Sequence, residues 1–143
     1  MIKFLHILVV ILALGTSAGL GIVLEFYGDN LRCGAFVLGA IKRIVAFFVV
    51  PGYVLMLATG LWMTHLSWSL TTKWIQFALV LWGVGAILLA LSVTVLHKQT
   101  GLFSTEEPTS TAYRKVSLLG RALGAVTGLV IVIILYLMVF KPT

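Results

Sequence analysis

Lysine, arginine, aspartate and glutamate are absent from four long stretches of this 143-residue chain, residues 4–24, 44–72, 74–96 and 122–140. A helix of about 20 apolar residues crosses the hydrocarbon core of a bilayer, so each stretch is long enough to span it. The strict polar–apolar alternation of a membrane strand is absent, and backbone amides in lipid must be paired. The four stretches therefore predict four transmembrane helices.

The composition excludes several soluble classes. Only 10% of the residues are charged and 61% are hydrophobic, whereas a soluble domain carries about 25% charged residues. A soluble fold of this length could not bury so much apolar surface, because small domains leave a large share of their surface in water. A soluble enzyme, a disordered chain and a disulfide scaffold are excluded. The lone cysteine, Cys33, also excludes an intrachain disulfide and a multi-cysteine metal site.

The sequence predicts an all-α, integral membrane four-helix bundle with up-down-up-down topology. Residues 1–143 form a single transmembrane domain in this interpretation, with helices at about 2–27, 36–66, 73–97 and 116–140. Pro51 removes one helix hydrogen bond and is expected to kink the second helix. The polar stretch Lys98–Lys115 is expected to be a mobile loop.

The basic residues predict the orientation. Three lie on the side of the termini, Lys3, Lys73 and Lys141, and seven on the other side: Arg32, Lys42, Arg43, Lys98, Arg114, Lys115 and Arg121. The positive-inside rule places the seven in the cytoplasm and both termini outside, as in a multi-pass protein of a bacterial inner membrane. The net charge of +6 then indicates contact with anionic lipid headgroups and no nucleic-acid partner.

Glycines at four-residue spacing predict the helix-packing faces. The fourth helix carries Gly120, Gly124 and Gly128, and the first carries Gly15 and Gly19. Small residues allow membrane helices to approach closely, since lipid provides no hydrophobic force between them. We expect these faces to pack within the bundle and also to bind neighbouring proteins.

His6 is the main candidate for a functional side chain, because an ionisable group inside a span is a functional hypothesis by default. It shares a helix face with Ala13 and Ser17, so it is expected to point into the bundle. Met63 and Gln76 lie at a similar depth on the predicted inner faces of their helices. The predicted cofactor site is therefore His6, Met63 and Gln76, with His6 as the metal ligand. A neutral imidazole can ligate haem iron or relay a proton; the alternative is a histidine satisfied by Gln76 or a headgroup.

Two metal hypotheses follow from this placement. A b-type haem would use His6 with Met63 or with a ligand from a partner. Copper(I) is the less favoured alternative, with a soft ligand set of His6, Met63, His65 and Met138. The helical phase turns His65 away from Met63, and His97 lies roughly 30 Å from His6 at 1.5 Å per residue. Neither histidine is expected to join His6 in a bis-histidine haem site.

Glu25 ends the first predicted helix and Arg121 begins the fourth, so they are expected to form a structural ion pair, with proton uptake or substrate binding as the alternative. The sequence holds no nucleophile elbow, phosphate loop, paired carboxylates or zinc signature. It therefore favours a protein that is not an enzyme.

Four segments carry a family resemblance: Lys3–Leu8, Pro51–Trp62, Leu70–Trp74 and Leu137–Pro142. They resemble a family of bacterial predicted integral membrane proteins described as a domain of unknown function. That family is distantly similar to the copper-resistance D-type membrane domain and to other small four-helix proteins with a histidine in the N-terminal helix, some of them haem-associated. The resemblance implies a four-helix fold and matches His6 to the family histidine.

The leading functional hypothesis is a non-catalytic accessory subunit of a larger respiratory or photosynthetic electron-transfer complex, in contact with lipids and other membrane subunits. A minimal bundle with glycine-rich faces and no catalytic set motivates it. The alternatives are a b-type haem protein that transfers electrons through His6, and a protein that handles copper or transports a small solute.

Overall fold

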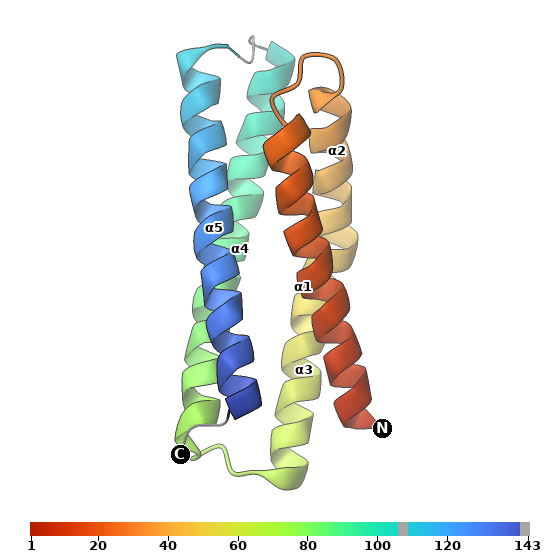
Figure 1. Cartoon of the computed structure of the whole chain (residues 1–143), viewed down its shortest axis with the longest axis vertical. Coiled ribbons are helices and arrows are strands. Elements are labelled where there is room, and N and C mark those ends of the chain that lie inside the picture. Colours follow the sequence, from red (N-terminus) through yellow and green to blue (C-terminus); the bar gives the residue numbers. More distant parts are fainter. Residues whose placement is uncertain (106–108, 141–143) are drawn as a thin grey trace.

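Four helical rods make up the structure, a computed structural model that describes residues 1–105 and 109–140 (Figure 1). The elements are α1 (Ile2–Tyr27), α2 (Gly34–Ile44), a π-helical segment (Val45–Val49), α3 (Val50–Ser67), α4 (Lys73–Thr105) and α5 (Thr111–Phe140). The second rod consists of α2, the π-helical segment and α3 in direct succession. All four rods are long and apolar enough to cross a membrane, and the described residues contain no strand. The prediction of an all-α four-helix bundle is confirmed.

The rods alternate in direction, as predicted. α1 begins and α5 ends at the same end of the molecule, where α3 also turns into α4 (Figure 1). We call this the termini end. The opposite end, called the Asp29 end, carries the α1–α2 connection, the end of α4 and the start of α5. The assignment of the termini end to the outer side of the membrane stays a prediction.

The second rod changes its helical hydrogen bonding just before Pro51. A proline has no backbone N–H, so the carbonyl four residues earlier, at Phe47, loses its usual donor. The π-helical segment Val45–Val49 includes this carbonyl. Single π turns of this kind are a recognised source of irregularity in long helices. The irregularity lies at the position where the sequence predicted a kink.

Helices α4 and α5 are longer than predicted. α4 continues to residue 105 where the prediction ended at 97, and α5 begins at 111 where the prediction began at 116. Most of the polar stretch predicted as a mobile loop is therefore helical; its residues 106–108 lie outside the described residues.

Tertiary contacts explain the added turns. Gln99 is 2% exposed and Tyr113 is 1% exposed, and Gln99 Nε2 donates to the Tyr113 hydroxyl at 3.0 Å. The ring of Phe103 meets that of Tyr113 edge-on, with centroids 5.7 Å apart. Ser110 Oγ accepts the amide of Tyr113 at 3.2 Å, the bond expected of a serine that caps a helix N-terminus. The sequence did not predict this buried contact, because the residues around it are polar.

The rods associate in pairs. α1 packs along α3, α4 packs along α5, and α2 lies against α4. Val10, Tyr53 and Met56 form one buried cluster, and Leu38, Ile41 and Leu96 form a second. Most other large apolar side chains are exposed, as expected where lipid is the solvent.

Candidate functional site

His6 lies on α1 and is 5% exposed. Its Nδ1 is 2.8 Å from Oγ1 of Thr59 on α3. The Thr59 hydroxyl is also 2.7 Å from the carbonyl oxygen of Leu55. A hydroxyl has one proton to donate, and a carbonyl can only accept, so Thr59 donates to Leu55 and accepts from His6 Nδ1–H.

This arrangement fixes the tautomer of His6. Burial disfavours the charged imidazolium at His6, so the ring is neutral, and with the proton on Nδ1 its Nε2 carries the lone pair. Nε2 is buried and has no hydrogen-bond partner among the described residues. An unpaired buried acceptor is unfavourable by about 1–3 kcal/mol, so Nε2 is the atom in this region best suited to bind a ligand.

Two glycines of α3 bring α1 close enough for this contact. A methyl group placed at Gly60 would lie 3.3 Å from Cε1 of His6, and one placed at Gly52 would lie 2.9 Å from Cβ of Ala13. Larger residues at these positions would separate α1 from α3, because both contacts are already tight.

A cavity of about 490 Å³ extends from His6 between the two helix pairs. Its volume is in the usual range for small-molecule sites, about 300–1,000 Å³. The walls come from α1, α3, α4 and α5 and are mainly apolar, with three methionines among them: Met56, Met63 and Met138. Lys3, Trp68 and Trp74 line the cavity toward the termini end.

Trp82 lines the cavity, and its ring stacks on that of Tyr53, which lies behind it, with centroids 5.1 Å apart. The Tyr53 hydroxyl donates to the backbone carbonyl of Trp82 at 3.1 Å. It also reaches the backbone of Gly85, where a side chain would collide with it. The indole Nε1 of Trp82 is buried and, like His6 Nε2, has no partner among the described residues. The cavity is therefore bordered by residues with one unsatisfied acceptor and one unsatisfied donor.

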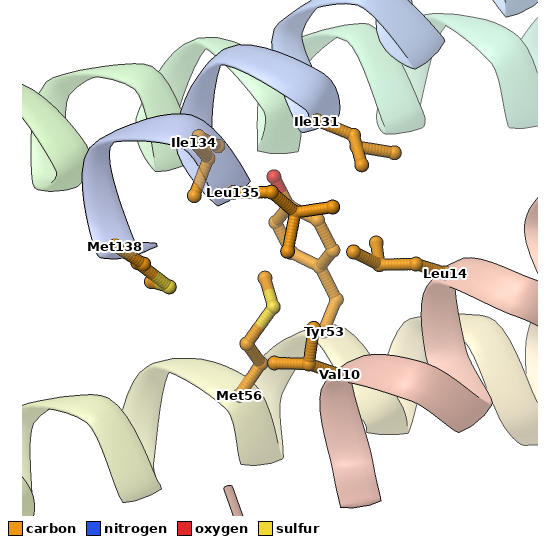
Figure 2. A pocket seen from close by; sticks show the side chains of 8 residues that line it. All are labelled: Val10, Leu14, Tyr53, Met56, Ile131, Ile134, Leu135 and Met138. Carbon is orange, nitrogen blue, oxygen red and sulfur yellow. The ribbon is translucent and has the colours of Figure 1, made fainter. Parts of the chain in front are cut away.

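A small pocket of about 10 Å³ lies beside Tyr53 (Figure 2). Val10, Met56, Ile134, Leu135 and Met138 line both this pocket and the large cavity. Figure 2 shows apolar side chains from α1, α3 and α5 converging on it. The pocket is at the lower size limit for a single water molecule, and its walls are mainly apolar. It is therefore a packing gap rather than a polar site.

Only two of the three predicted cofactor residues line the cavity. Met63 and His6 both line the cavity, but Gln76 is exposed and does not line it. The prediction that Gln76 lies on the inner face of α4 was wrong, because the buried residues of this half of the helix are Ile75, Ala78 and Gly85.

Of the two further ligands in the copper hypothesis, one lines the cavity and one does not. Met138 lines the cavity, whereas His65 is exposed and does not. His97 is exposed on the Asp29 half of α4. The described residues contain no group of three or more His, Cys, Asp or Glu side chains that could hold a metal ion. A site at His6 would thus rely on one imidazole with thioethers nearby.

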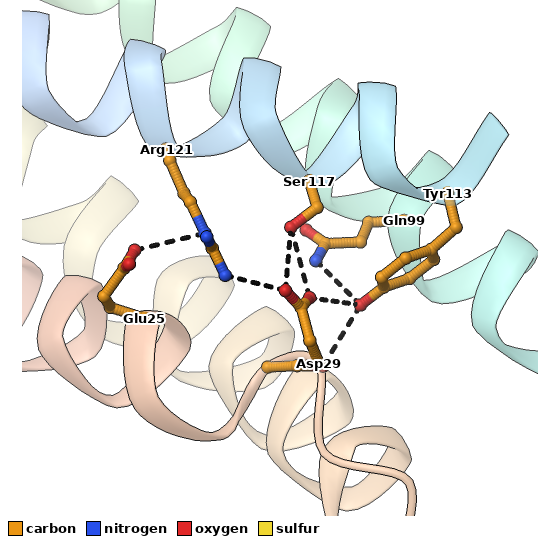
Figure 3. A network of polar contacts seen from close by, with 7 residues as sticks. Glu25, Asp29, Gln99, Tyr113, Ser117 and Arg121 are labelled. Atoms are coloured by element: carbon orange, nitrogen blue, oxygen red, sulfur yellow. Dashed lines mark hydrogen bonds and ion pairs between the residues drawn. The ribbon is translucent and has the colours of Figure 1, made fainter. Parts of the chain in front are cut away.

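A polar network joins α1, α4 and α5 at the Asp29 end (Figure 3). Arg121 places Nε 3.1 Å from Glu25 and one terminal nitrogen 2.7 Å from Asp29. Asp29 also lies 2.9 Å from the Tyr113 hydroxyl and 3.1 Å from the Ser117 hydroxyl. The aspartate thus accepts from three side chains of α5.

Sequence reasoning considered Glu25 and Arg121 but missed four residues of this network: Asp29, Gln99, Tyr113 and Ser117. A signal was present, since Tyr113, Ser117 and Arg121 recur every four residues and share one helix face. Every polar side chain shown in Figure 3 has a partner within the chain. The network therefore fits a structural tie better than a binding site.

Four of the predicted packing glycines do not pack within the chain. A methyl group at Gly15, Gly19, Gly124 or Gly128 would meet no heavy atom within 4 Å. Gly120 differs, since a methyl group there would lie 3.4 Å from Val95. The expectation that all five glycines face the bundle is corrected accordingly. α1 and α5 instead pack through faces with larger side chains, such as those of Ala13 and Tyr113.

The comparisons with known proteins agree with this architecture. The family described as predicted integral membrane protein (DUF2269) matches residues 1–142. No curated protein and no solved structure is significantly similar to the chain, and the comparisons give no support to a likeness with the copper-resistance D-type domain. The chain therefore belongs to the DUF2269 family of predicted integral membrane proteins.

Proposed function

We propose that this membrane protein binds a b-type haem through Nε2 of His6 and takes part in electron transfer within the membrane. The observation that carries the proposal is the unpaired lone pair of a buried, neutral imidazole that lines an apolar cavity of about 490 Å³. A proximal histidine is one of the common axial ligands of haem iron in proteins.

Thr59 supplies the supporting contact that such a ligand needs. Metal-ligating histidines nearly always donate their second ring N–H to an acceptor, which fixes the tautomer and the ring orientation. The 2.8 Å contact from Nδ1 to Thr59 is a bond of this kind. Gly60 contributes by leaving room for the imidazole against α3.

The remaining walls suit an apolar macrocycle. Met63 lines the same cavity as His6 and is the proposed second axial ligand, since a thioether also ligates haem iron. When bound, haem supplies one-electron redox chemistry. Since Nε2 is covered by neighbouring side chains, binding requires those side chains to move apart.

The test is the absorption spectrum of the protein purified from haem-replete cells in a mild non-ionic detergent. We expect a Soret band that is lost in His6→Ala and kept in His65→Ala, because His65 is exposed and does not line the cavity. No Soret band in the wild type, or a band unchanged in His6→Ala, would refute the proposal. Copper in place of iron in the same sample would favour the copper hypothesis instead.

A second candidate function is that of an accessory subunit in a larger membrane complex. The open faces at Gly15 and Gly19 on α1 and at Gly124 and Gly128 on α5 favour it, because small-residue faces are where membrane helices associate. Purification in mild detergent should then recover a stoichiometric partner that the double substitution Gly124→Leu, Gly128→Leu releases. Recovery of the wild type free of other membrane subunits would contradict this candidate.

A further inference from the structure

We propose that Lys3 recognises a carboxylate at the mouth of the cavity, so that the ligand is an amphiphile with an anionic edge toward the termini end and an apolar body that reaches His6. This inference rests on the proposed ligand site at His6. It adds the chemical class of the ligand and the direction in which it lies.

The position of Lys3 follows from helix geometry. Lys3 precedes His6 by three residues, so both lie on one face of α1, about 4.5 Å apart along the axis. Both line the cavity, and Lys3 is the one nearer the termini end. Trp68 and Trp74 line the cavity at the same end, where their rings meet edge-on with centroids 5.5 Å apart.

Among the described residues, no acidic side chain is paired with Lys3. Among the described residues that line the cavity, Lys3 is the only one with a charged side chain. Lys3 forms no ion pair within the described part of the chain. Glu25 and Asp29 bind Arg121 at the opposite end, and the two remaining acidic residues follow α4 in the sequence, at positions 106 and 107.

An apolar cavity with a single cation at its mouth indicates the chemical class of the ligand. An apolar cavity excludes a free polar anion, and a cation at its mouth favours a carboxylate over a neutral group. Haem carries two carboxylates on one edge of an otherwise apolar ring, and a long-chain fatty acid carries one at the end of its chain. Both have the required anionic edge, so the experiment compares them.

The experiment titrates the apo form of the full chain, in non-ionic detergent at low salt, with haem and with haem dimethyl ester. Esterification removes both carboxylate charges and keeps the iron. The wild type is expected to bind haem roughly three- to tenfold more tightly than the ester, as for an ion pair at a partly desolvated site. The preference should fall at high salt, because salt screens exposed charges.

Two lysine variants give the matched comparison. Lys3→Met should lose the preference for haem over the ester, whereas Lys73→Met should keep it. Lys73 begins α4 at the same end of the molecule but does not line the cavity. Retention of the preference in Lys3→Met, or equal affinity of the wild type for both compounds, would overturn the role of Lys3 while a His6-dependent Soret band left the haem proposal standing.

A parallel titration with oleic acid, followed by tryptophan fluorescence, separates the two ligand sources. If oleic acid binds in a Lys3-dependent manner and haem does not bind, the carboxylate contact stands and the haem proposal fails. If neither compound binds, both proposals fail. Binding of oleic acid that is unchanged in Lys3→Met would contradict the carboxylate contact.

Discussion

At the scale of single residues, the proposed ligand site depends on the buried imidazole of His6. A purely structural histidine would satisfy both ring nitrogens, because an unpaired polar atom is unfavourable in a low-dielectric interior. His6 satisfies Nδ1 through Thr59, and its Nε2 has no partner among the residues that the structure describes. One of the two ring nitrogens of His6 is therefore still available to a ligand.

Thr59→Val should weaken haem binding by about 10- to 100-fold, the usual effect of removing the residue that orients a metal-ligating histidine. Valine keeps the shape of threonine but cannot accept the Nδ1 proton of His6, so the tautomer and ring orientation are no longer fixed. Haem titration by absorbance measures the affinity. Thr127→Val is the matched control, because Thr127 donates to Leu123 on its own helix, α5, and does not line the cavity. An equal loss in both variants would show that the effect is not specific to the site.

The candidate site was only partly predictable from the sequence at this scale. His6 and Met63 were identified because a histidine one turn into an apolar span and a methionine at matching depth are visible in one helix at a time. Thr59 and Trp82 were missed, since a threonine or tryptophan in a membrane helix has no special pattern. The position of Gln76 was wrong because helical phase is relative, and the sequence does not say which face the neighbouring helix covers.

At the scale of helices, the two ends of the bundle have different roles. At the termini end the helix pairs leave a cavity between them. At the Asp29 end the network of Figure 3 ties α1, α4 and α5 together.

Tyr113→Phe should lower the free energy of unfolding in detergent by about 1–3 kcal/mol, because it leaves buried Gln99 without its partner and removes one donor to Asp29. Glu25→Gln should lower it by less than about 1 kcal/mol, because the Glu25 side chain is 54% exposed and its ion pair is screened by solvent. Denaturant unfolding followed by circular dichroism measures both values. A larger effect from Glu25→Gln than from Tyr113→Phe would contradict this ranking of the contacts.

Some helix boundaries could be predicted from the sequence and others could not. The four spans follow from the positions of charged residues, because charge is costly in lipid wherever the helix lies. The final turns of α4 and the first turn of α5 were missed, since those residues are polar and become helical through the contact between Gln99 and Tyr113. A contact between two helices cannot be predicted from the residues of either helix alone.

At the scale of the whole molecule, the helices are arranged in pairs that border the cavity. α1 packs closely with α3, and α4 with α5 (Figure 1). Residues of all four helices line the cavity, toward the termini end. The proposed ligand would therefore lie near one membrane surface. The positive-inside rule predicts that this is the outer surface.

Cysteine labelling tests that orientation. In intact spheroplasts, a membrane-impermeant maleimide should leave Cys33 unlabelled, because Cys33 lies at the Asp29 end. The same reagent should label a cysteine introduced at Ser69 in a Cys33→Ser background, since Ser69 lies in the exposed α3–α4 connection. Inside-out vesicles should give the opposite result. Labelling of Cys33 from outside the cell would reverse the predicted orientation.

Replacement of His6 by glycine and addition of imidazole tests the central claim most directly. His6→Gly removes the ring and leaves space beside Gly60 and Thr59, which a free imidazole can fill. We expect His6→Gly to lose the Soret band of the wild type and to regain it when imidazole is added with haem, while Thr59→Val in the same background responds less. A Soret band that survives in His6→Gly without imidazole, or one that imidazole cannot restore in a folded variant, would contradict ligation by His6.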